Sequence, residues 1–177
     1  MIVDSLKLIN DINKIKIYDN FLQKETCDHI LKSIEGYPFY RTEIDKPGLP
    51  KTGLVYNLGK DHQFYKVLLR NIIQKKILDI KNYRSDRFYV NLFLKNENPF
   101  FHVDSESEKD ITFLYYPSNS DNINYSGNTD FILDDKIISI LYVQNRLVSF
   151  PANFTHRATS FYNKDRFSLA LKMTHEG

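Results

Sequence analysis

The chain has 177 residues, 42% of them apolar, which suits one domain with one substantial core and leaves no room for a second catalytic domain. The 24 Lys and Arg residues nearly balance 22 Asp and Glu, so the net charge of +2 carries no clear signal for nucleic acid or acidic lipid. The single cysteine, Cys27, excludes an internal disulfide and favours a reducing, cytoplasmic compartment, and charges within residues 1–17 argue against a signal peptide or a membrane span.

The first half of the chain is predicted to be helical. Apolar residues at helical spacing predict one helix over Lys24 to Glu35 and a second over about His62 to Leu78, with Asp61 placed to cap the second. Between them, the prolines and glycines of Tyr37 to Leu58 break any long element. We therefore expect a surface loop without regular structure there.

The second half is predicted to be β-structure. Short runs rich in β-branched and aromatic residues are separated by clusters of Asn, Ser, Asp and Gly. The predicted strands are Arg87 to Leu94, Ile111 to Tyr116, Thr129 to Leu133, Ile137 to Val143, Leu147 to Phe150 and Phe167 to Met173. Two helices followed by many short strands predict an α+β domain whose sheets close on each other.

One pair of residues in this half has metal-ligand spacing. His102 and Asp104 share a face if the backbone between them is extended, and His156 follows a predicted strand and a turn. Two histidines and one carboxylate on one face of a metal, with open positions opposite, are typical of non-haem Fe(II) oxygenases. By itself, an H-x-D pair with a distant histidine arises easily by chance, and surface or capping roles are commoner.

A cation follows the last of these residues. Arg166 and Ser168 point to the same side of a predicted strand, so a guanidinium fork and a hydroxyl together could hold a carboxylate. The alternative is a strand arginine that pairs with a surface acid.

The order of these features resembles the 2-oxoglutarate- and Fe(II)-dependent oxygenase superfamily, and within it the prolyl-hydroxylase-like branch. The resemblance covers about Phe88 to Met173 and rests on six signals in family order. They are His102-Val103-Asp104, Ile111 to Tyr116, Gly127-Asn128-Thr129-Asp130-Phe131, Leu147-Val148-Ser149-Phe150, His156 and Arg166-Phe167-Ser168. The fold it implies is a double-stranded β-helix, a jelly-roll, cupin-like barrel over about 86–173, with helical support from about 1–80, forming one domain over 1–177.

The resemblance also implies the site and its cofactors. Fe(II) would be held by the two histidines and the aspartate, with 2-oxoglutarate and O₂ as co-substrates, and ascorbate is allowed as an additional reductant. Arg166 would bind the distal carboxylate of 2-oxoglutarate, assisted by Ser168, by the hydroxyl of Tyr116 and by Asn91. Phe93 stands where relatives often carry a tyrosyl contact to the co-substrate. A glycine pair of the family is reduced to Ser126-Gly127.

The implied reaction is hydroxylation of a C–H bond, with a protein or peptide side chain such as proline as the first candidate substrate. Phe100, Phe101 and Phe113 are candidates to line the reaction space, although strand aromatics more often belong to the core. Three alternatives stay open at this point. They are oxidation of a nucleobase or small metabolite by the same chemistry, a non-catalytic binding barrel, and a cupin-like sugar-binding or isomerase barrel.

Overall fold

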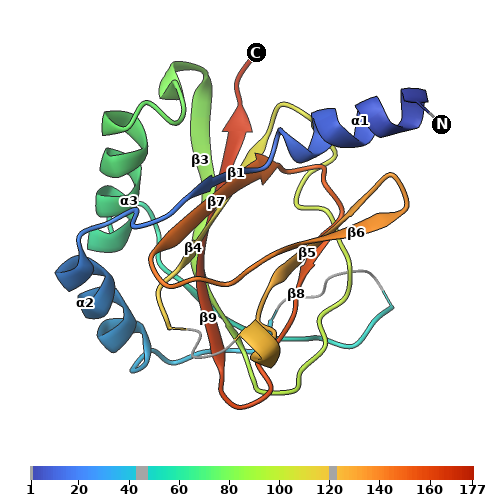
Figure 1. Cartoon of the computed structure of the whole chain (residues 1–177). Coiled ribbons are helices and arrows are strands. Elements are labelled where there is room, and N and C mark those ends of the chain that lie inside the picture. Colours follow the sequence, from blue (N-terminus) through green and yellow to red (C-terminus); the bar gives the residue numbers. More distant parts are fainter. Residues whose placement is uncertain (1, 43–47, 120–122) are drawn as a thin grey trace.

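A computed structural model of the chain describes residues 2–42, 48–119 and 123–177. The helices are α1 (Ile2–Ile12), α2 (Lys24–Ile34) and α3 (Gln63–Gln74), with two short 3₁₀ helices at Ile80–Asn82 and Ile123–Tyr125. Helices α2 and α3 lie together on one side of the molecule, whereas α1 lies near the other end of the sheets (Figure 1). None of the helices in the described ranges is long and apolar enough to cross a membrane.

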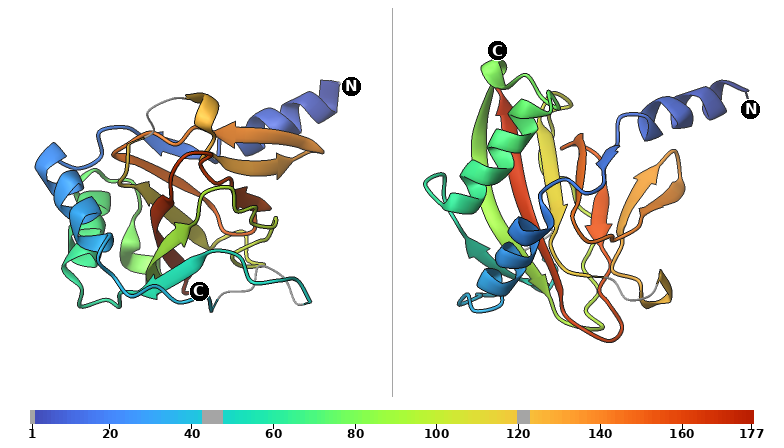
Figure 2. Two further views of the ribbon diagram at one scale, coloured as in Figure 1. Left: turned by 90° about the horizontal axis from the view of Figure 1, so that it is seen from below. Right: turned by 60° about the vertical axis from the view of Figure 1, so that its left-hand side comes forward.

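Two antiparallel sheets form the body of the molecule (Figures 1 and 2). The larger sheet has the order β1-β7-β4-β9-β3-β2, and the smaller has the order β6-β5-β8. Their strands are β1 (Lys16–Tyr18), β2 (Leu54–Asn57), β3 (Tyr83–Phe93), β4 (Ile111–Tyr116), β5 (Thr129–Leu133), β6 (Lys136–Ile140), β7 (Arg146–Pro151), β8 (His156–Ala158) and β9 (Arg166–His175).

The larger sheet is covered on both faces, and strand β9 shows how its residues divide between them. Leu169 and Leu171 point to the outer face, where they join the apolar cluster beneath helices α2 and α3. Ala170 points inward, into the cluster shared with the smaller sheet. Because side chains alternate along a strand, Ser168 and Lys172 share this inward direction. The space between the two sheets therefore contains polar side chains as well as apolar core residues.

The sequence-based expectations for the elements are largely confirmed. Strands β4 and β5 have the predicted bounds, and helix α2 differs by one residue at its end. The prediction of no regular structure over 37–58 is wrong, because residues 54–57 form β2 by pairing with β3. Such a four-residue edge strand is set by its partner, and the prolines and glycines that precede it in the sequence obscured it.

Smaller corrections concern the helices and the shortest strands. Helix α3 ends at Gln74, earlier than predicted, and its N-cap is His62, whose Nδ1 accepts from the backbone N–H of Phe64. Asp61 is thus one residue too early for the predicted cap. Helix α1 and strands β1 and β8 were not predicted, since their sequences are short or interrupted by charges.

Candidate metal and co-substrate site

The two histidines of the predicted motif are joined through their backbones. The N–H of His102 donates to the carbonyl of His156 at 3.0 Å, and the N–H of His156 donates back at 2.9 Å. The N–H of Asp104 in turn donates to the carbonyl of Ala152 at 2.9 Å. These bonds extend the smaller sheet by one irregular segment and bring together three side chains that are far apart in the sequence.

The ligand atoms of these side chains form a compact group. One ligand atom from each of His102, Asp104 and His156 lies within 4.8 Å of the other two. Nε2 of His102 is 3.7 Å from Oδ1 of Asp104, and Nε2 of His156 is 3.6 Å from Oδ2. An ion about 2.1 Å from each of two adjacent ligands separates them by roughly 3 Å. Metal binding therefore requires only a small closing movement.

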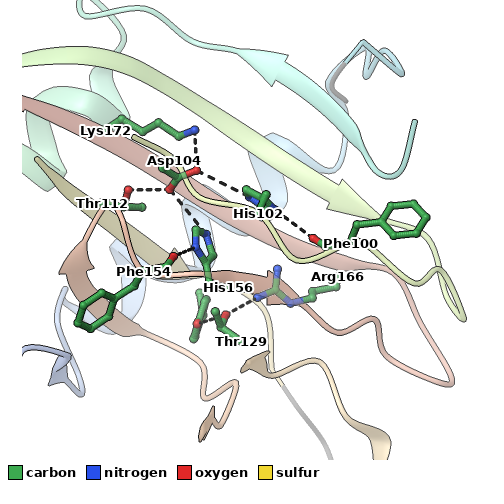
Figure 3. A network of polar contacts seen from close by, with 10 residues as sticks. Phe100, His102, Asp104, Thr112, Thr129, Phe154, His156, Arg166 and Lys172 are labelled. Atoms are coloured by element: carbon green, nitrogen blue, oxygen red, sulfur yellow. Dashed lines mark hydrogen bonds and ion pairs between the residues drawn. The ribbon is translucent and has the colours of Figure 1, made fainter. Parts of the chain in front are cut away.

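The outer nitrogens of both imidazoles fix the orientation of the rings. Nδ1 of His102 lies 3.0 Å from the carbonyl of Phe100, and Nδ1 of His156 lies 2.9 Å from the carbonyl of Phe154 (Figure 3). A carbonyl only accepts, so each Nδ1 carries the proton and donates it. This tautomer leaves the lone pair of both Nε2 atoms directed at the shared space, as metal-ligating histidines require.

Two further residues hold the carboxylate of Asp104. The ammonium of Lys172 lies 2.7 Å from Oδ1, and the hydroxyl of Thr112 donates to Oδ2 at 2.6 Å (Figure 3). Thr112 and Lys172 are cross-strand partners in β4 and β9, so the sheet register places both donors beside one carboxylate. The carboxylate is oriented before any ion binds.

Charge states in this cluster follow from burial and neighbours. Burial lowers the pKa of His156 to about 4, so its imidazole is neutral at neutral pH. Burial alone would raise the pKa of Asp104, but His156, Lys172 and His102 hold it well below its usual range. Burial would likewise lower the pKa of Lys172, but Tyr89 and Asp104 raise it. A neutral imidazole beside an ionised carboxylate is the donor set that a divalent ion needs.

Arg166 lies close to the metal-ligand cluster and is 1% exposed. Its Nε donates to the carbonyl of Gly127 at 2.8 Å, its Nη1 to the hydroxyl of Ser168 at 3.2 Å and its Nη2 to the hydroxyl of Thr129 at 3.2 Å. In the described ranges no carboxylate forms an ion pair with this guanidinium. A buried cation held only by neutral groups favours an anionic ligand, because burial of an uncompensated charge is costly.

A small cavity of about 40 Å³ connects Arg166 to the metal-ligand cluster. Ser168 and Asn91, both predicted from the resemblance, line it, and Thr129 lines it as well. The ring of Tyr116 lies 5.4 Å from the guanidinium carbon of Arg166, and its hydroxyl hydrogen-bonds Thr129 at 2.6 Å. Tyr116 does not line this cavity itself, but it hydrogen-bonds to Thr129, which does.

A larger cavity of about 220 Å³ adjoins the first and is also lined by His102 and Asp104. Its wall comes from β2, β3, β9, the residues before β2 and the segment 102–104. The lining residues are Thr52, Gly53, Val55, Arg87, Tyr89, Asn91, Phe93, His102, Val103, Asp104 and Lys172. The segment 37–58 therefore supplies part of the wall, although residues 43–47 within it lie outside the described ranges.

Sequence reasoning missed three contributors to the site: Thr112, Thr129 and Lys172. All three lie on predicted strands, and alternation from Ser168 could have directed Lys172 inward, but no local signal pairs it with Asp104. The prediction that Phe113 lines the reaction space is wrong, because Phe113 packs in the core beneath the helices. Neither Phe100 nor Phe101 lines the two cavities.

Comparison with solved structures places this arrangement among proteins of known fold. A prolyl hydroxylase from Trichoplax adhaerens, in complex with a hypoxia inducible factor oxygen degradation domain peptide fragment, matches with a TM-score of 0.71 and 17% identity, over 97% of this chain and 89% of that one. A prolyl-4-hydroxylase from Pseudomonas putida matches with a TM-score of 0.68 and 13% identity, over 98% of this chain and all of that one.

HygX from Streptomyces hygroscopicus, with nickel and 2-oxoglutarate bound, matches with a TM-score of 0.70 and 9% identity, over 92% of this chain and 83% of that one. No protein-family model and no curated protein sequence matches the chain. The predicted double-stranded β-helix is thus confirmed, and the chain has the fold of the 2-oxoglutarate- and Fe(II)-dependent oxygenases, including prolyl hydroxylases.

Proposed function

We propose that the protein is a 2-oxoglutarate- and Fe(II)-dependent dioxygenase that hydroxylates a C–H bond. His102, Asp104 and His156 would hold the iron, and Arg166 would bind the distal carboxylate of 2-oxoglutarate. The observation that carries the proposal is the buried guanidinium of Arg166, which shares one small cavity with all three candidate ligands. The guanidinium and the three candidate metal ligands line the same cavity. This arrangement fits 2-oxoglutarate, a dicarboxylate that carries a keto group beside one of its two carboxylates.

The residues present fit the metal. Fe(II) accepts imidazole nitrogen and carboxylate oxygen, and three protein ligands leave positions open for a co-substrate. When bound, the iron would activate O₂, the oxidant of a balanced reaction in which 2-oxoglutarate, O₂ and a C–H substrate yield succinate, CO₂ and the alcohol. The protein supplies the ligands, their orientation and the binding of both substrates.

The chain's own residues divide the remaining tasks. Arg166 compensates the charge of the co-substrate, and Ser168, Thr129 and Gly127 hold the guanidinium in one position through three hydrogen bonds. Lys172 and Thr112 keep the carboxylate of Asp104 aimed at the cluster. These contacts set the geometry before substrate arrives, so little ordering is needed during the reaction.

For the substrate, we propose a side chain of a protein or peptide, with proline as the first candidate. The bound peptide of the Trichoplax enzyme supports this class. A small-molecule substrate is the second candidate, because HygX binds hygromycin B and because a cavity of 220 Å³ is small for a folded surface to enter. Among the alternatives, a nucleobase gains no support from the net charge of +2.

The test loads the protein with Fe(II) under anaerobic conditions and then supplies 2-oxoglutarate, O₂ and ascorbate with a panel of proline peptides and small molecules. The expected result is succinate formed in step with one added oxygen atom in one substrate. Arg166→Gln should raise the KM for 2-oxoglutarate by about tenfold or more, because a charged hydrogen bond is lost.

Arg157→Gln is the matched control, since Arg157 neighbours His156 but pairs with Asp130 at 3.4 Å. It should leave the KM for 2-oxoglutarate unchanged. Absence of both Fe(II) binding and 2-oxoglutarate decarboxylation would instead support a non-catalytic barrel.

A further inference from the structure

A lysine ammonium contacts one of the three candidate metal ligands. Nζ of Lys172 lies 2.7 Å from Oδ1 of Asp104, and Nε2 of His102 lies 3.7 Å from the same oxygen (Figure 3). An ion about 2.1 Å from either oxygen of Asp104 would lie within roughly 7 Å of this ammonium. A fixed positive charge therefore lies beside the place where the metal would bind.

The lysine provides more than the orientation of Asp104 requires. The hydroxyl of Thr112 already donates to Oδ2 at 2.6 Å, and a hydroxyl is neutral. The side chain of Lys172 is only 18% exposed, so its charge has lost much of its contact with water. Burial of a charge is costly, whereas a second neutral donor would orient the carboxylate without that cost. The charge of Lys172 is thus the property that orientation does not explain.

The surroundings of the ammonium keep it at this position. Lys172 on β9 lies directly opposite Thr112 on β4, and this register directs both side chains to Asp104. Nζ of Lys172 also lies 5.6 Å from the ring centroid of Tyr89, a residue that is 7% exposed. The face of an aromatic ring attracts a cation without neutralising its charge. The sheet register and the ring therefore hold the positive charge next to the metal ligands before any ion binds.

A fixed positive charge next to an iron ion affects the two oxidation states of the ion differently. Conversion of Fe(II) to Fe(III) removes one electron and adds one positive charge, so a neighbouring cation repels Fe(III) more strongly than Fe(II). At a separation of about 7 Å and an effective dielectric constant of about 20, a unit charge shifts this equilibrium by about tenfold or more. The reaction proposed above needs Fe(II), and O₂ can take up the electron that Fe(II) loses.

We propose that the ammonium of Lys172, through its contact with Asp104, stabilises Fe(II) relative to Fe(III) at this site. This role rests on the proposed function and adds a task for one residue beside its metal ligands. When the ion has lost an electron to O₂, a one-electron reductant such as ascorbate returns it, and the charge of Lys172 makes that return more favourable. Comparison of wild type with variants at this one position isolates the effect, because all other charges of the molecule are common to both.

The experiment measures the Fe(III)/Fe(II) reduction potential of the full chain loaded with iron alone. The method is an anaerobic titration with redox mediators, followed by electron paramagnetic resonance of the Fe(III) form. Lys172→Met removes the charge and the donor, Lys172→Gln keeps a neutral donor, and Lys172→Arg keeps the charge. The preference for Fe(II) should fall by about tenfold or more in Lys172→Met and Lys172→Gln, which lowers the potential by about 59 mV per tenfold change. Lys172→Arg should stay within about threefold of the wild type, because arginine keeps the charge in a different geometry.

Thr112→Val is the matched control, because it removes a hydrogen bond to the same carboxylate without a change of charge. It should lower the potential much less than Lys172→Gln does. Thermal unfolding with and without Mn(II) verifies that each variant is folded and binds metal. A wild-type potential in Lys172→Gln would overturn the proposal, and so would an equal fall in Thr112→Val or in Lys172→Arg, since a charge effect predicts neither.

A separate readout tests the oxygenase function itself. The visible charge-transfer absorption of an Fe(II)–2-oxoglutarate complex should form in the wild type when 2-oxoglutarate is added without O₂. If it forms and the variants keep the wild-type potential, the oxygenase assignment stands and the role of Lys172 is wrong. If it fails to form while the potentials still shift as expected, the role of Lys172 at a metal site stands and the oxygenase assignment is wrong.

Discussion

The ammonium of Lys172 and the carboxylate of Asp104 form a nearly buried ion pair, with Nζ 2.7 Å from Oδ1 and side-chain exposures of 18% and 4%. Removal of one partner of such a pair leaves an uncompensated charge and costs about 3–5 kcal/mol when burial is complete. Bound metal places a second compensating charge on the same carboxylate. The cost of losing the lysine should therefore depend on whether metal is present.

Lys172→Met should destabilise the metal-free protein by about 2–4 kcal/mol, somewhat less than for a fully buried pair. The Mn(II)-loaded variant should lose less, because the ion supplies the missing positive charge to Asp104. By linkage, the variant should then gain more stability from Mn(II) than the wild type does. Thermal unfolding with and without Mn(II), together with calorimetric Mn(II) affinity, measures both effects.

Lys136→Met is the control, since Lys136 forms an exposed pair with Asp134 at 3.6 Å and lies away from the site. It should change neither stability nor Mn(II) affinity by more than about 0.5 kcal/mol. An equal gain from Mn(II) in wild type and Lys172→Met would contradict the linkage between this ion pair and the metal site.

Gly127→Ala should weaken 2-oxoglutarate binding through the backbone. Gly127 has φ +83°, and an added Cβ would lie 2.1 Å from Cε1 of the buried ring of Phe161. Its carbonyl accepts from Nε of Arg166, so a shift of this backbone moves the guanidinium. We expect a stability loss of about 2–4 kcal/mol and a several-fold higher Kd for 2-oxoglutarate.

Gly59→Ala is the matched control for this substitution. Gly59 has φ +69° with open space around its Cβ direction, so it carries the same backbone strain without a clash. It should cost about 1 kcal/mol and leave 2-oxoglutarate affinity unchanged. Equal effects of the two substitutions would show that strain alone, and not displacement of Phe161 and Arg166, explains the loss.

Much of this arrangement could be predicted because the informative residues are local. All residues of strand β4 except Leu114 are β-branched or aromatic, and β5 is bounded by turn residues, so both strands have the predicted bounds. The residues His102, Asp104, His156 and Arg166 were found through their spacing and order along the chain. The structure brings them together, which is the juxtaposition that the prediction required.

The rest of the site could not be predicted, because it depends on the pairing of strands that lie far apart in the sequence. Lys172 joins the site because β9 pairs with β4 in a register that opposes Thr112 to Lys172. A slip of β9 by one residue would turn Lys172 to the helix-covered face. The same applies to Arg87, whose position opposite Lys172 follows a bulge between Ser85 and Arg87. No local pattern in the sequence specifies these registers.

The stability of the wall of the larger cavity should depend on pH through the carboxylate of Glu97. Its Oε1 accepts from the backbone N–H of Gly53 at 2.8 Å and from Arg41, and its Oε2 accepts from the N–H of Leu94 at 3.0 Å. Burial alone would raise the pKa of Glu97, but these donors lower it below 4.5. A lowered folded-state pKa means that the stabilisation is fully present above pH 4.5 and is lost as pH falls through the folded-state value.

Hydrogen exchange of the amide of Gly53 measures this effect directly. After correction for the intrinsic pH dependence of exchange, protection should stay constant from neutral pH to about pH 5 and should fall below pH 4.5. In Glu97→Gln the protection should be lower throughout and independent of pH over this interval. A wild-type protection that stays constant below pH 4.5 would show that Glu97 does not hold this segment.

Asn145→Ala should destabilise the fold without changing the metal site. Oδ1 of Asn145 accepts from the N–H of Leu22 and the hydroxyl of Tyr115, each at 2.9 Å, and its Nδ2 donates to the carbonyl of Leu22 at 2.7 Å. Asn145 also has φ +60°, which asparagine tolerates better than alanine. We expect a loss of about 2–4 kcal/mol in urea unfolding, because buried donors and acceptors lose their partners.

Tyr115→Phe separates one of these bonds from the others. It removes only the phenol donor and keeps the ring in the core, so it should cost about 1 kcal/mol, and neither variant should alter Mn(II) affinity. Since Leu22 precedes helix α2 and Asn145 precedes β7, the larger loss in Asn145→Ala would show that this side chain attaches the helical layer to the sheet. Equal losses in the two variants would instead mean that the bonds to Leu22 contribute little and that apolar packing alone holds the two layers together.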